Sequence, residues 1–364
     1  MRFIFGGMMV AYLAANAYIY IRALQMLATG STLTKILFSI IFWAVALALF
    51  ISIGLRDATL PATLAKAMFS IGSVWLVFTL YMTLTLLACD ITRIFLQQFR
   101  LGFWCALGIT TAILIYGHIN YLHPKLIELD ITLDKPIEGG SMTIVAISDV
   151  HLGEGTGKRQ MQRYADMINA QNPDLILIAG DLIDNSVVPL YRDKMNEELS
   201  LLHAPMGIYM VSGNHEYISG IDHSAQFLAT TPITLLRDKV ISLPNGVQII
   251  GRDDRSNRRR KQLEDLVGEA DTQRPMIVID HQPYHLSKSD SLKIDLQISG
   301  HTHRGQVWPA SLLTDRMYEQ SYGYRKWSYS HIFVSCGLSL WGPPFRIGTN
   351  SDMAVIKLKG NNIK

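Results

Sequence analysis

The first third of this 364-residue chain is far more apolar than the rest, and no other feature of the sequence constrains the fold as strongly. Four apolar runs lie there, and each approaches the ~20 residues that a helix needs to cross the hydrocarbon of a bilayer. The runs are residues 3–21, 36–55, 67–88 and 101–119. Charged residues gather between them, at the level expected for lipid headgroups. The sequence therefore predicts a multi-pass α-helical membrane domain with about four transmembrane helices over residues 1–120.

The four apolar runs contain no Lys, Arg, Asp or Glu. Because such residues mark ion and substrate pathways inside membranes, we expect this domain to anchor the protein in the lipid bilayer rather than to transport. The expected location is the cell membrane. Four spans would place both termini on one side, but the Lys and Arg residues that set orientation are balanced, so the side that holds the remainder of the chain stays open.

From residue 121 to residue 364, short apolar runs alternate with amphipathic stretches, as in a layered α/β domain. Residues 143–147 and 175–178 have the character of buried strands, and residues 159–170 between them that of a helix. Further strands are predicted at 208–211, 276–279, 296–298, 332–334 and 354–358. The net charge of +3 is too mild to indicate a nucleic-acid partner.

Polar motifs follow five of the predicted strands. Open α/β sheets place their ligands at the loops beyond the carboxyl ends of strands, so we expect these motifs to form one site. Any one motif alone is more often a surface turn or a hydrogen-bonded core residue, but a fold has no structural need for histidines at so many strand ends. In chain order the residues are Asp149, His151, Asp181, Asp184, Asn214, His215, His281, His301 and His303.

The side chains of these motifs are carboxylates, imidazoles and an amide, without a thiolate. Such donors suit divalent manganese, iron or zinc. An Asp-x-His pair and a His-x-His pair can each hold one ion from a turn, which indicates two adjacent ions. Two ions ~3.5 to 4 Å apart need a shared anionic ligand, and Asp181 follows its strand in a position to bridge them.

The order Asp-x-His, Gly-Asp-x-x-Asp, Gly-Asn-His-Glu, His, Gly-His-x-His resembles that of the calcineurin-like metallophosphoesterase superfamily over residues 142–358. Segments 300–306, 334–337 and 344–347 are similar to a membrane-associated bacterial branch that includes UDP-diacylglucosamine pyrophosphatases. Arg304 stands where that branch usually has glycine, at a rim position from which it could contact a phosphate or a carboxylate. The resemblance implies a four-layer α/β/β/α fold for the second domain.

The resemblance also implies roles for the site residues. One metal ion would be held by Asp149, His151, Asp181 and His303. The other would be held by Asp181, Asn214, His281 and His301. A hydroxide bridging the two ions would attack phosphorus, while the catalytic residue His215, oriented by Asp184, would protonate the leaving oxygen or stabilise the transition state. Manganese is the expected metal, with iron or zinc as alternatives.

The expected function is therefore that of a dinuclear phosphohydrolase that cleaves a phosphodiester or a pyrophosphate. Membrane anchoring suggests a lipid or lipid-linked phosphorylated substrate. The alternative is a metal-binding membrane receptor or scaffold without turnover. A basic run over residues 252–261 either meets anionic headgroups or substrate phosphates, or is a solvated loop, and the sequence leaves both interpretations open.

Overall fold

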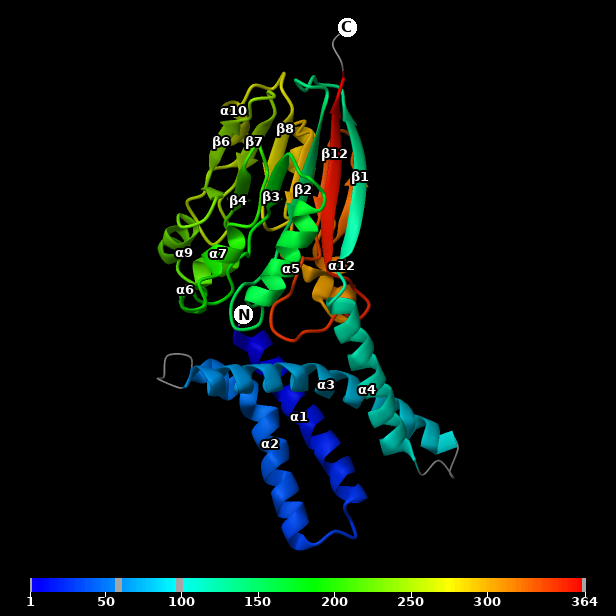
Figure 1. Ribbon diagram of the computed structural model, residues 1–364. Helices are drawn as coiled ribbons and strands as arrows, with labels where there is room; N and C mark the ends of the chain where they lie inside the picture. The colour runs from blue at the N-terminus through cyan, green and yellow to red at the C-terminus, as the bar shows by residue number, and fades with distance from the viewer. Residues whose placement is uncertain (1, 56–60, 96–100, 362–364) are drawn as a thin grey trace. The chain divides into compact units, whose positions relative to one another are not determined.

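The computed structural model describes residues 2–55, 61–95 and 101–361 (Figure 1). The chain divides into two compact units, Met1–Ile119 with Gly342–Ile347, and Asn120–Trp341 with Gly348–Lys364. Segment Gly342–Ile347 clusters with the helices rather than with the rest of the predicted second domain. The reason is a backbone hydrogen bond, because the N–H of Arg346 donates to the carbonyl of Gly117 at 2.9 Å.

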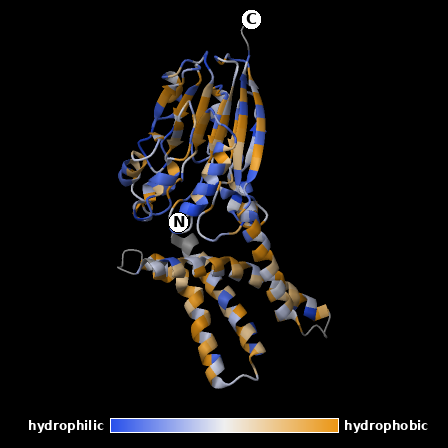
Figure 2. Ribbon diagram, viewed as in Figure 1, coloured by the Kyte–Doolittle hydropathy of each residue, from blue (hydrophilic) through white to orange (hydrophobic). Residues whose placement is uncertain are grey.

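The first unit consists of four helices, and its length and composition fit a membrane domain. The helices are α1 (Arg2–Met26), α2 (Thr32–Gly54), α3 (Ala62–Phe95) and α4 (Gly102–Tyr121). Within the described residues, three segments are long and apolar enough to cross a membrane: Thr32–Gly54, Lys66–Phe95 and Gly102–Tyr121. Large apolar side chains such as Ile40 and Ile41 are exposed, as lipid-facing residues would be. Figure 2 shows that these helices are largely hydrophobic along their length. The predicted α-helical membrane domain is thus confirmed.

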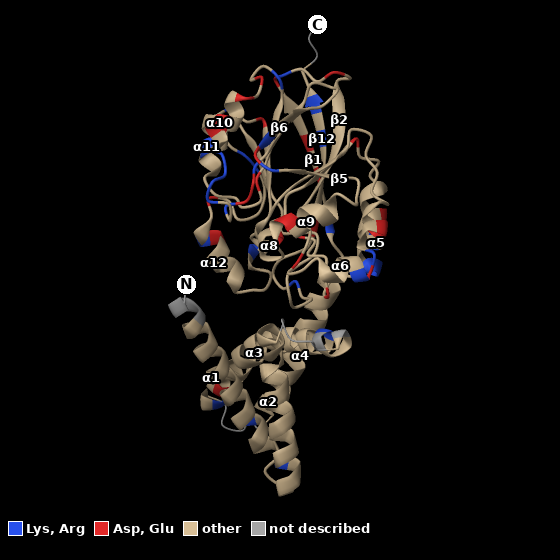
Figure 3. Ribbon diagram, turned by 90° about the vertical axis from the view of Figure 1, so that its left-hand side faces the viewer, with Lys and Arg blue, Asp and Glu red and all other residues tan. Residues whose placement is uncertain are grey.

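Helix α1 contains the first predicted span but is not among these three segments. Polar contacts interrupt its apolar surface: buried Asn16 accepts a hydrogen bond from the indole of Trp75 at 2.8 Å, and Arg22 pairs with Asp90 at 2.6 Å. Figure 3 shows few other charged residues on the four helices. The count of four spans stays a prediction.

The second unit contains two six-stranded sheets. In spatial order, the first sheet consists of β1 (Lys125–Leu133), β12 (Asp352–Gly360), β2 (Ser141–Ile147), β3 (Leu175–Ile178), β4 (Ile208–Val211) and β5 (Ile233–Leu236). The second consists of β10 (Gly323–Lys326), β11 (His331–Val334), β9 (Leu296–Ser299), β8 (Met276–Ile279), β7 (Gln248–Gly251) and β6 (Lys239–Ser242). Strands β2 to β5 are parallel, as are β7, β8, β9 and β11.

Successive side chains of a strand face opposite sides of its sheet, and this alternation builds four layers. In β2, Ile144 and Ala146 join the core between the sheets, whereas Val145 and Ile147 pack against helices. The first sheet is covered by α5 (Lys158–Asn169), α6 (Val188–Arg192), α7 (Met195–Leu199) and α9 (Ile221–Leu228). The second is covered by α10 (Leu263–Gly268) and α11 (Leu286–Ser291). The α/β/β/α fold is therefore confirmed.

The remaining short elements lie in loops after strands. They are α8 (Asn214–Ile218), the 3-10 helix η1 (His303–Gly305) and α12 (Ala310–Met317). All seven predicted strands and the helix at 159–170 are present, with ends that shift by a few residues at most. Helix α8 and η1 begin at Asn214 and His303, so two of the predicted site residues stand at the first positions of these turns.

Candidate functional site

The five predicted motifs meet at one edge of the second unit. The motifs follow β2, β3 and β4 in the first sheet and β8 and β9 in the second. Within each sheet these strands are parallel, so their carboxyl ends share an edge. Because the sheets pack face to face, the two edges adjoin, and the side chains form overlapping clusters in each of which the ligand atoms lie within 4.8 Å of one another. Two of these clusters are described below, and the group His151, Asp181 and His215 links them.

The first cluster contains Asp149, His151 and His303. The Nε2 atoms of His151 and His303 are 3.2 Å apart. Asp149 Oδ1 lies 3.4 Å from Nε2 of His303 and 3.8 Å from Nε2 of His151. The three side chains thus present one carboxylate oxygen and two ring nitrogens to a common point.

The second cluster contains Asp181, His281 and His301, and Asn214 adjoins it. Nε2 of His281 lies 3.1 Å from Asp181 Oδ2 and 3.1 Å from Asn214 Oδ1. The same Asp181 oxygen is 3.9 Å from Nε2 of His151, a residue of the first cluster. Asp181 therefore lies between the two clusters.

The donor atoms of this site fit a cation. The ring Nδ1 of His281 lies 2.8 Å from the carbonyl of Ala179, so in the neutral tautomer Nδ1–H donates there. Its Nε2 lone pair then faces oxygens of Asp181 and Asn214, and three electron-rich atoms need a positive charge between them. A backbone carbonyl that orients a histidine in this way is typical of metal ligands. The Asp/His clusters can accordingly hold divalent metal.

The buried carboxylates of the site favour the binding of positive charge beside them. Burial opposes ionisation of Asp149 and Asp181, but the neighbouring histidines outweigh it and hold the pKa of both carboxyl groups below the usual range. Burial likewise opposes protonation of His151, yet its interactions with the nearby carboxylates of Asp149 and Asp184 raise its pKa to about 10. By contrast, burial and the charge of His281 lower the pKa of His301 to about 4.

The backbone at the site is strained. Asp149, His151, Asp181, His301 and His303 all have φ between 45° and 72°, in the left-handed region. Such a conformation costs roughly 1–3 kcal/mol for each residue that is not glycine and persists only where the surroundings enforce it. Five strained residues in one cluster indicate a functional site.

Glycines keep the backbone close to these ligands. A Cβ atom on Gly213 would collide with Asp181 Oδ1, and one on Gly300 would collide with Asp149 Oδ2. The site therefore needs glycine at both positions for the carboxylates to keep their orientation.

The predicted catalytic pair lies beside the first cluster. Asp184 Oδ1 is 3.2 Å from Nδ1 of His215 and 3.6 Å from Nδ1 of His151. Neither contact is a hydrogen bond, so Asp184 lies close to both rings without hydrogen bonding to them. The rings of His215 and His151 meet edge to face with centroids 4.6 Å apart. All nine residues selected from the sequence therefore lie together.

Two contributors were not selected from the sequence. Ser148 Oγ donates to Asp149 Oδ2 at 2.5 Å, and Glu216 orders the backbone around Asp181. The buried Glu216 carboxylate accepts from the N–H groups of Asp181, Ile183 and Gly213 at 3.0, 2.9 and 2.7 Å. Burial and the charge of Asp181 raise the pKa of Glu216 to about 7. The sequence signal that could have identified Glu216 is its position directly after His215 in the Gly-Asn-His-Glu motif.

Replacing Glu216 with alanine should destabilise the protein by about 3 kcal/mol or more, because three buried N–H donors would lose their acceptor. For a domain of this size, that corresponds to a melting temperature lower by roughly 6 to 12 °C. Thermal unfolding of the full chain in detergent measures the shift. Glu197→Ala is the control, since Glu197 pairs with Lys158 at an exposed site. Equal melting temperatures for the two variants would refute a structural role for Glu216.

Arg304 contacts a carboxylate. Its Nη2 lies 3.5 Å from Asp315 Oδ2, and its guanidinium packs 4.6 Å from the ring of Tyr322. The residue has a φ of 46°, which glycine adopts without strain. The structure thus supports the carboxylate contact, and the φ value accounts for glycine being usual here in the branch that the sequence resembles.

Comparison with known proteins gives consistent matches over the second unit. Residues 142–305 match the family described as calcineurin-like phosphoesterase. An uncharacterized metallophosphoesterase of Helicobacter pylori is 32% identical over 245 residues, which cover 66% of this chain and 65% of that protein. An uncharacterized metallophosphoesterase of Campylobacter jejuni is 28% identical, and the match covers 95% of this chain and 95% of that protein.

A third relative, from Danio rerio, is named a transmembrane protein with metallophosphoesterase domain. It is 29% identical, and the match covers 70% of this chain and 62% of the relative. The chain thus spans somewhat less than two thirds of the length of the Helicobacter pylori and Danio rerio relatives.

Proposed function

Residues 142–305 form a calcineurin-like phosphoesterase domain, and from this premise we propose that the chain is a metal-dependent phosphohydrolase that cleaves a phosphodiester or pyrophosphate bond. The observation that carries the proposal is the position of Asp181 between two Asp/His clusters. Two adjacent cation sites with a shared carboxylate are the arrangement that phosphoryl transfer uses to stabilise both attacking and leaving oxygens.

In this proposal, Asp149, His151, Asp181 and His303 hold one divalent ion. Asp181, Asn214, His281 and His301 hold the other. When bound, the ions supply Lewis acidity that polarises the phosphoryl group and acidifies water. Asp149 and Asp181 are ionised and orient the histidine rings, and the Nδ1 hydrogen bond of His281 keeps its Nε2 lone pair available. Manganese is the metal that we propose, with iron and zinc as alternatives.

His215 acts in the proposed mechanism as the proton donor to the leaving oxygen. The carboxylate of Asp184, 3.2 Å from Nδ1, orients the ring toward the substrate in this proposal. His215 is 9% exposed, so its ring is accessible at one edge while it stays fixed by its neighbours. The exposed Trp341, whose ring centroid lies 6.3 Å from that of His215, offers an apolar surface beside the leaving group.

The three apolar helices support a multi-pass protein of the cell membrane. We propose a lipid or lipid-linked phosphate ester as substrate, because anchoring confines the enzyme to the surface where such substrates reside. Rates with the full chain in vesicles test this: a lipid-embedded diester should be hydrolysed faster than a soluble diester of equal leaving group. Equal rates would refute the lipid preference.

Removal of metal should abolish hydrolysis of bis-p-nitrophenyl phosphate by the full chain in detergent, and manganese should restore it. Chelator-treated protein is assayed before and after addition of manganese, iron(II), zinc or magnesium, and bound metal is counted by mass spectrometry. Activity that persists without metal would refute the proposed chemistry. Two bound ions without turnover of any phosphate ester would instead support the receptor or scaffold alternative.

A further inference from the structure

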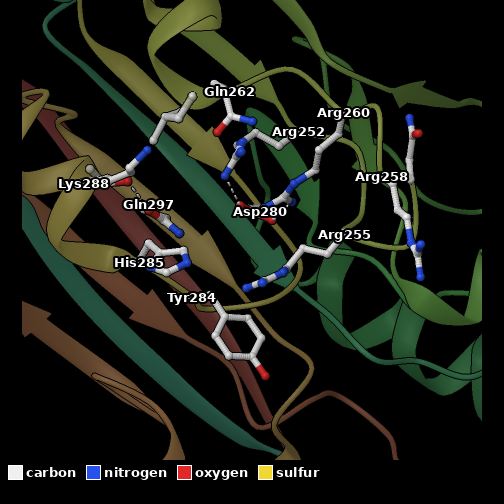
Figure 4. Close-up of a pocket in the computed structure, with 13 residues that line it drawn as sticks. Arg252, Arg255, Arg258, Arg260, Gln262, Asp280, Tyr284, His285, Lys288 and Gln297 are labelled. Atoms are coloured by element: carbon white, nitrogen blue, oxygen red, sulfur yellow. Dashed lines mark hydrogen bonds and ion pairs between the residues drawn. The ribbon is translucent and has the colours of Figure 1, made fainter.

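Five basic side chains line a cavity of about 250 Å³ in the second unit (Figure 4). The charged residues around it are Arg252, Arg255, Arg258, Arg260, Lys288 and Asp280. We refer to this cavity as the basic pocket. Its volume is several times the ~30 Å³ that a water molecule occupies in the liquid, so a phosphate group with some of its water fits inside. The basic run of the sequence therefore builds a concave surface rather than a solvated loop.

The loop that forms the basic pocket is fixed to the loops of the metal site. Asp253 accepts hydrogen bonds from Ser212 at 2.5 Å and from Asn257 at 3.0 Å. Ser212 lies two residues before Asn214. Asp254 accepts from Gln282, which directly follows His281, at 2.8 Å. These contacts hold the loop that carries the arginines in place before any ligand arrives, which lowers the entropic cost of ordering it on binding.

The charges of the basic pocket are only partly balanced. Arg252 and Arg260 share Asp280, with Nη1 to carboxylate distances of 2.6 and 3.2 Å. Lys288 pairs with Glu264 at 2.7 Å. Within the described part of the chain, neither Arg255 nor Arg258 forms an ion pair. Two guanidinium groups therefore remain available for an anion.

The basic pocket and the metal site adjoin. Asp280 directly precedes His281, and a series of ring contacts joins the two regions. The guanidinium of Arg255 lies 4.1 Å from the ring centroid of Tyr284, as Figure 4 shows. Tyr284 packs on Tyr318 with centroids 4.9 Å apart, and Tyr318 lies 6.4 Å from His301. A substrate that contacts both regions would therefore lie against Tyr284 and Tyr318.

The planar fork of donors on arginine matches the oxygens of phosphate, which makes arginine the preferred residue for such recognition. We propose that the basic pocket binds a phosphate group of the substrate other than the one that is hydrolysed. The inference rests on the proposed function for the identity of the substrate. It assigns to that substrate a second phosphate, either in a soluble diphosphate or in a lipid-linked one.

Titration calorimetry of the metal-free full chain in detergent with inorganic phosphate tests the pocket. The metal-free chain is used so that no bound ion contributes to phosphate binding, and the variants assign saturable binding to the basic pocket. We expect the double variant Arg255→Ala/Arg258→Ala to weaken the affinity tenfold or more. Arg259→Ala is the matched control, because Arg259 is exposed in the same loop but does not line the pocket, and it should change the affinity less than twofold.

Two competitors identify the source of the phosphate. ADP represents a soluble diphosphate, and detergent micelles with phosphatidic acid represent a lipid phosphate. Displacement of inorganic phosphate by either competitor supports phosphate binding in the basic pocket. The competitor that displaces it shows whether the bound phosphate belongs to a soluble diphosphate or to a lipid. No saturable binding, equal affinity in all variants, or displacement by neither competitor would overturn the proposal. The titration involves no turnover, so an enzyme inactive toward phosphate esters would refute the proposed function without altering this result.

Discussion

Replacing Asp181 with asparagine is expected to lower metal-dependent hydrolysis on the order of 10³-fold or more. Asp181 is the residue between the two clusters, with Oδ2 3.1 Å from His281 and 3.9 Å from His151. Two bound ions contribute several kcal/mol of transition-state stabilisation, and each 1.36 kcal/mol corresponds to a factor of ten in rate. A neutral amide in this position would neither balance the charge of two cations nor bridge them. Rates with manganese and metal content per chain measure the effect.

Asparagine preserves the shape of the side chain, including the oxygen that accepts from the N–H of His215 at 2.8 Å. The substitution therefore tests charge rather than packing. Asp222→Asn is the matched control, because Asp222 is an exposed acidic residue on α9. It should retain both ions and full activity. If Asp181→Asn kept two ions per chain and at least a tenth of the rate, the bridging role would be wrong.

Replacing His215 with glutamine should lower kcat by roughly 10² to 10⁴, the usual contribution of general acid catalysis, and leave metal content unchanged. The ring lies next to the first cluster, with Asp184 3.2 Å from its Nδ1, and one of its nitrogens lies within 4.8 Å of ligand atoms of His151 and Asp181, so metal content is measured together with the rate. Because a proton donor matters most for poor leaving groups, the loss should grow with the pKa of the leaving alcohol. A series of substituted phenyl diesters measures this dependence.

His223→Gln is the control for His215, since His223 is an exposed histidine of α9. Its rates should equal those of the unmodified protein. Equal losses for good and poor leaving groups in His215→Gln would contradict proton donation and favour a role in binding. Loss of one ion per chain would show that His215 is a metal ligand instead.

The strands that carry the site could be predicted because each is a short, continuous apolar run followed by a polar motif. β3, β4 and β8 have the predicted bounds, and every residue of β3 and β8 is fully buried or nearly so. Strands of mixed composition were missed. β1 alternates apolar residues with Glu128 and Asp130, and β10 has the sequence GYRK, so neither resembles a buried strand.

The spans of the first unit were predictable for a similar reason, because crossing a bilayer depends on the length and apolarity of a single segment. Helices α2, α3 and α4 each contain such a segment. The polar contact of Asn16 in α1 with Trp75 depends on the packing of two helices, so no single segment could predict it.

The residues able to carry the chemistry could be identified from the sequence, since the residue types and their position after strands are local properties. How these residues meet depends on the tertiary structure: Asp149 and His303 are more than 150 residues apart and lie in loops of different sheets, yet their ligand atoms are 3.4 Å apart. The packing of the sheets likewise places Asp181 between two clusters. It also brings three backbone N–H groups within hydrogen-bond distance of Glu216 and forms the basic pocket. Such distances depend on strand pairing and sheet packing, which arise from the whole core and from no single segment.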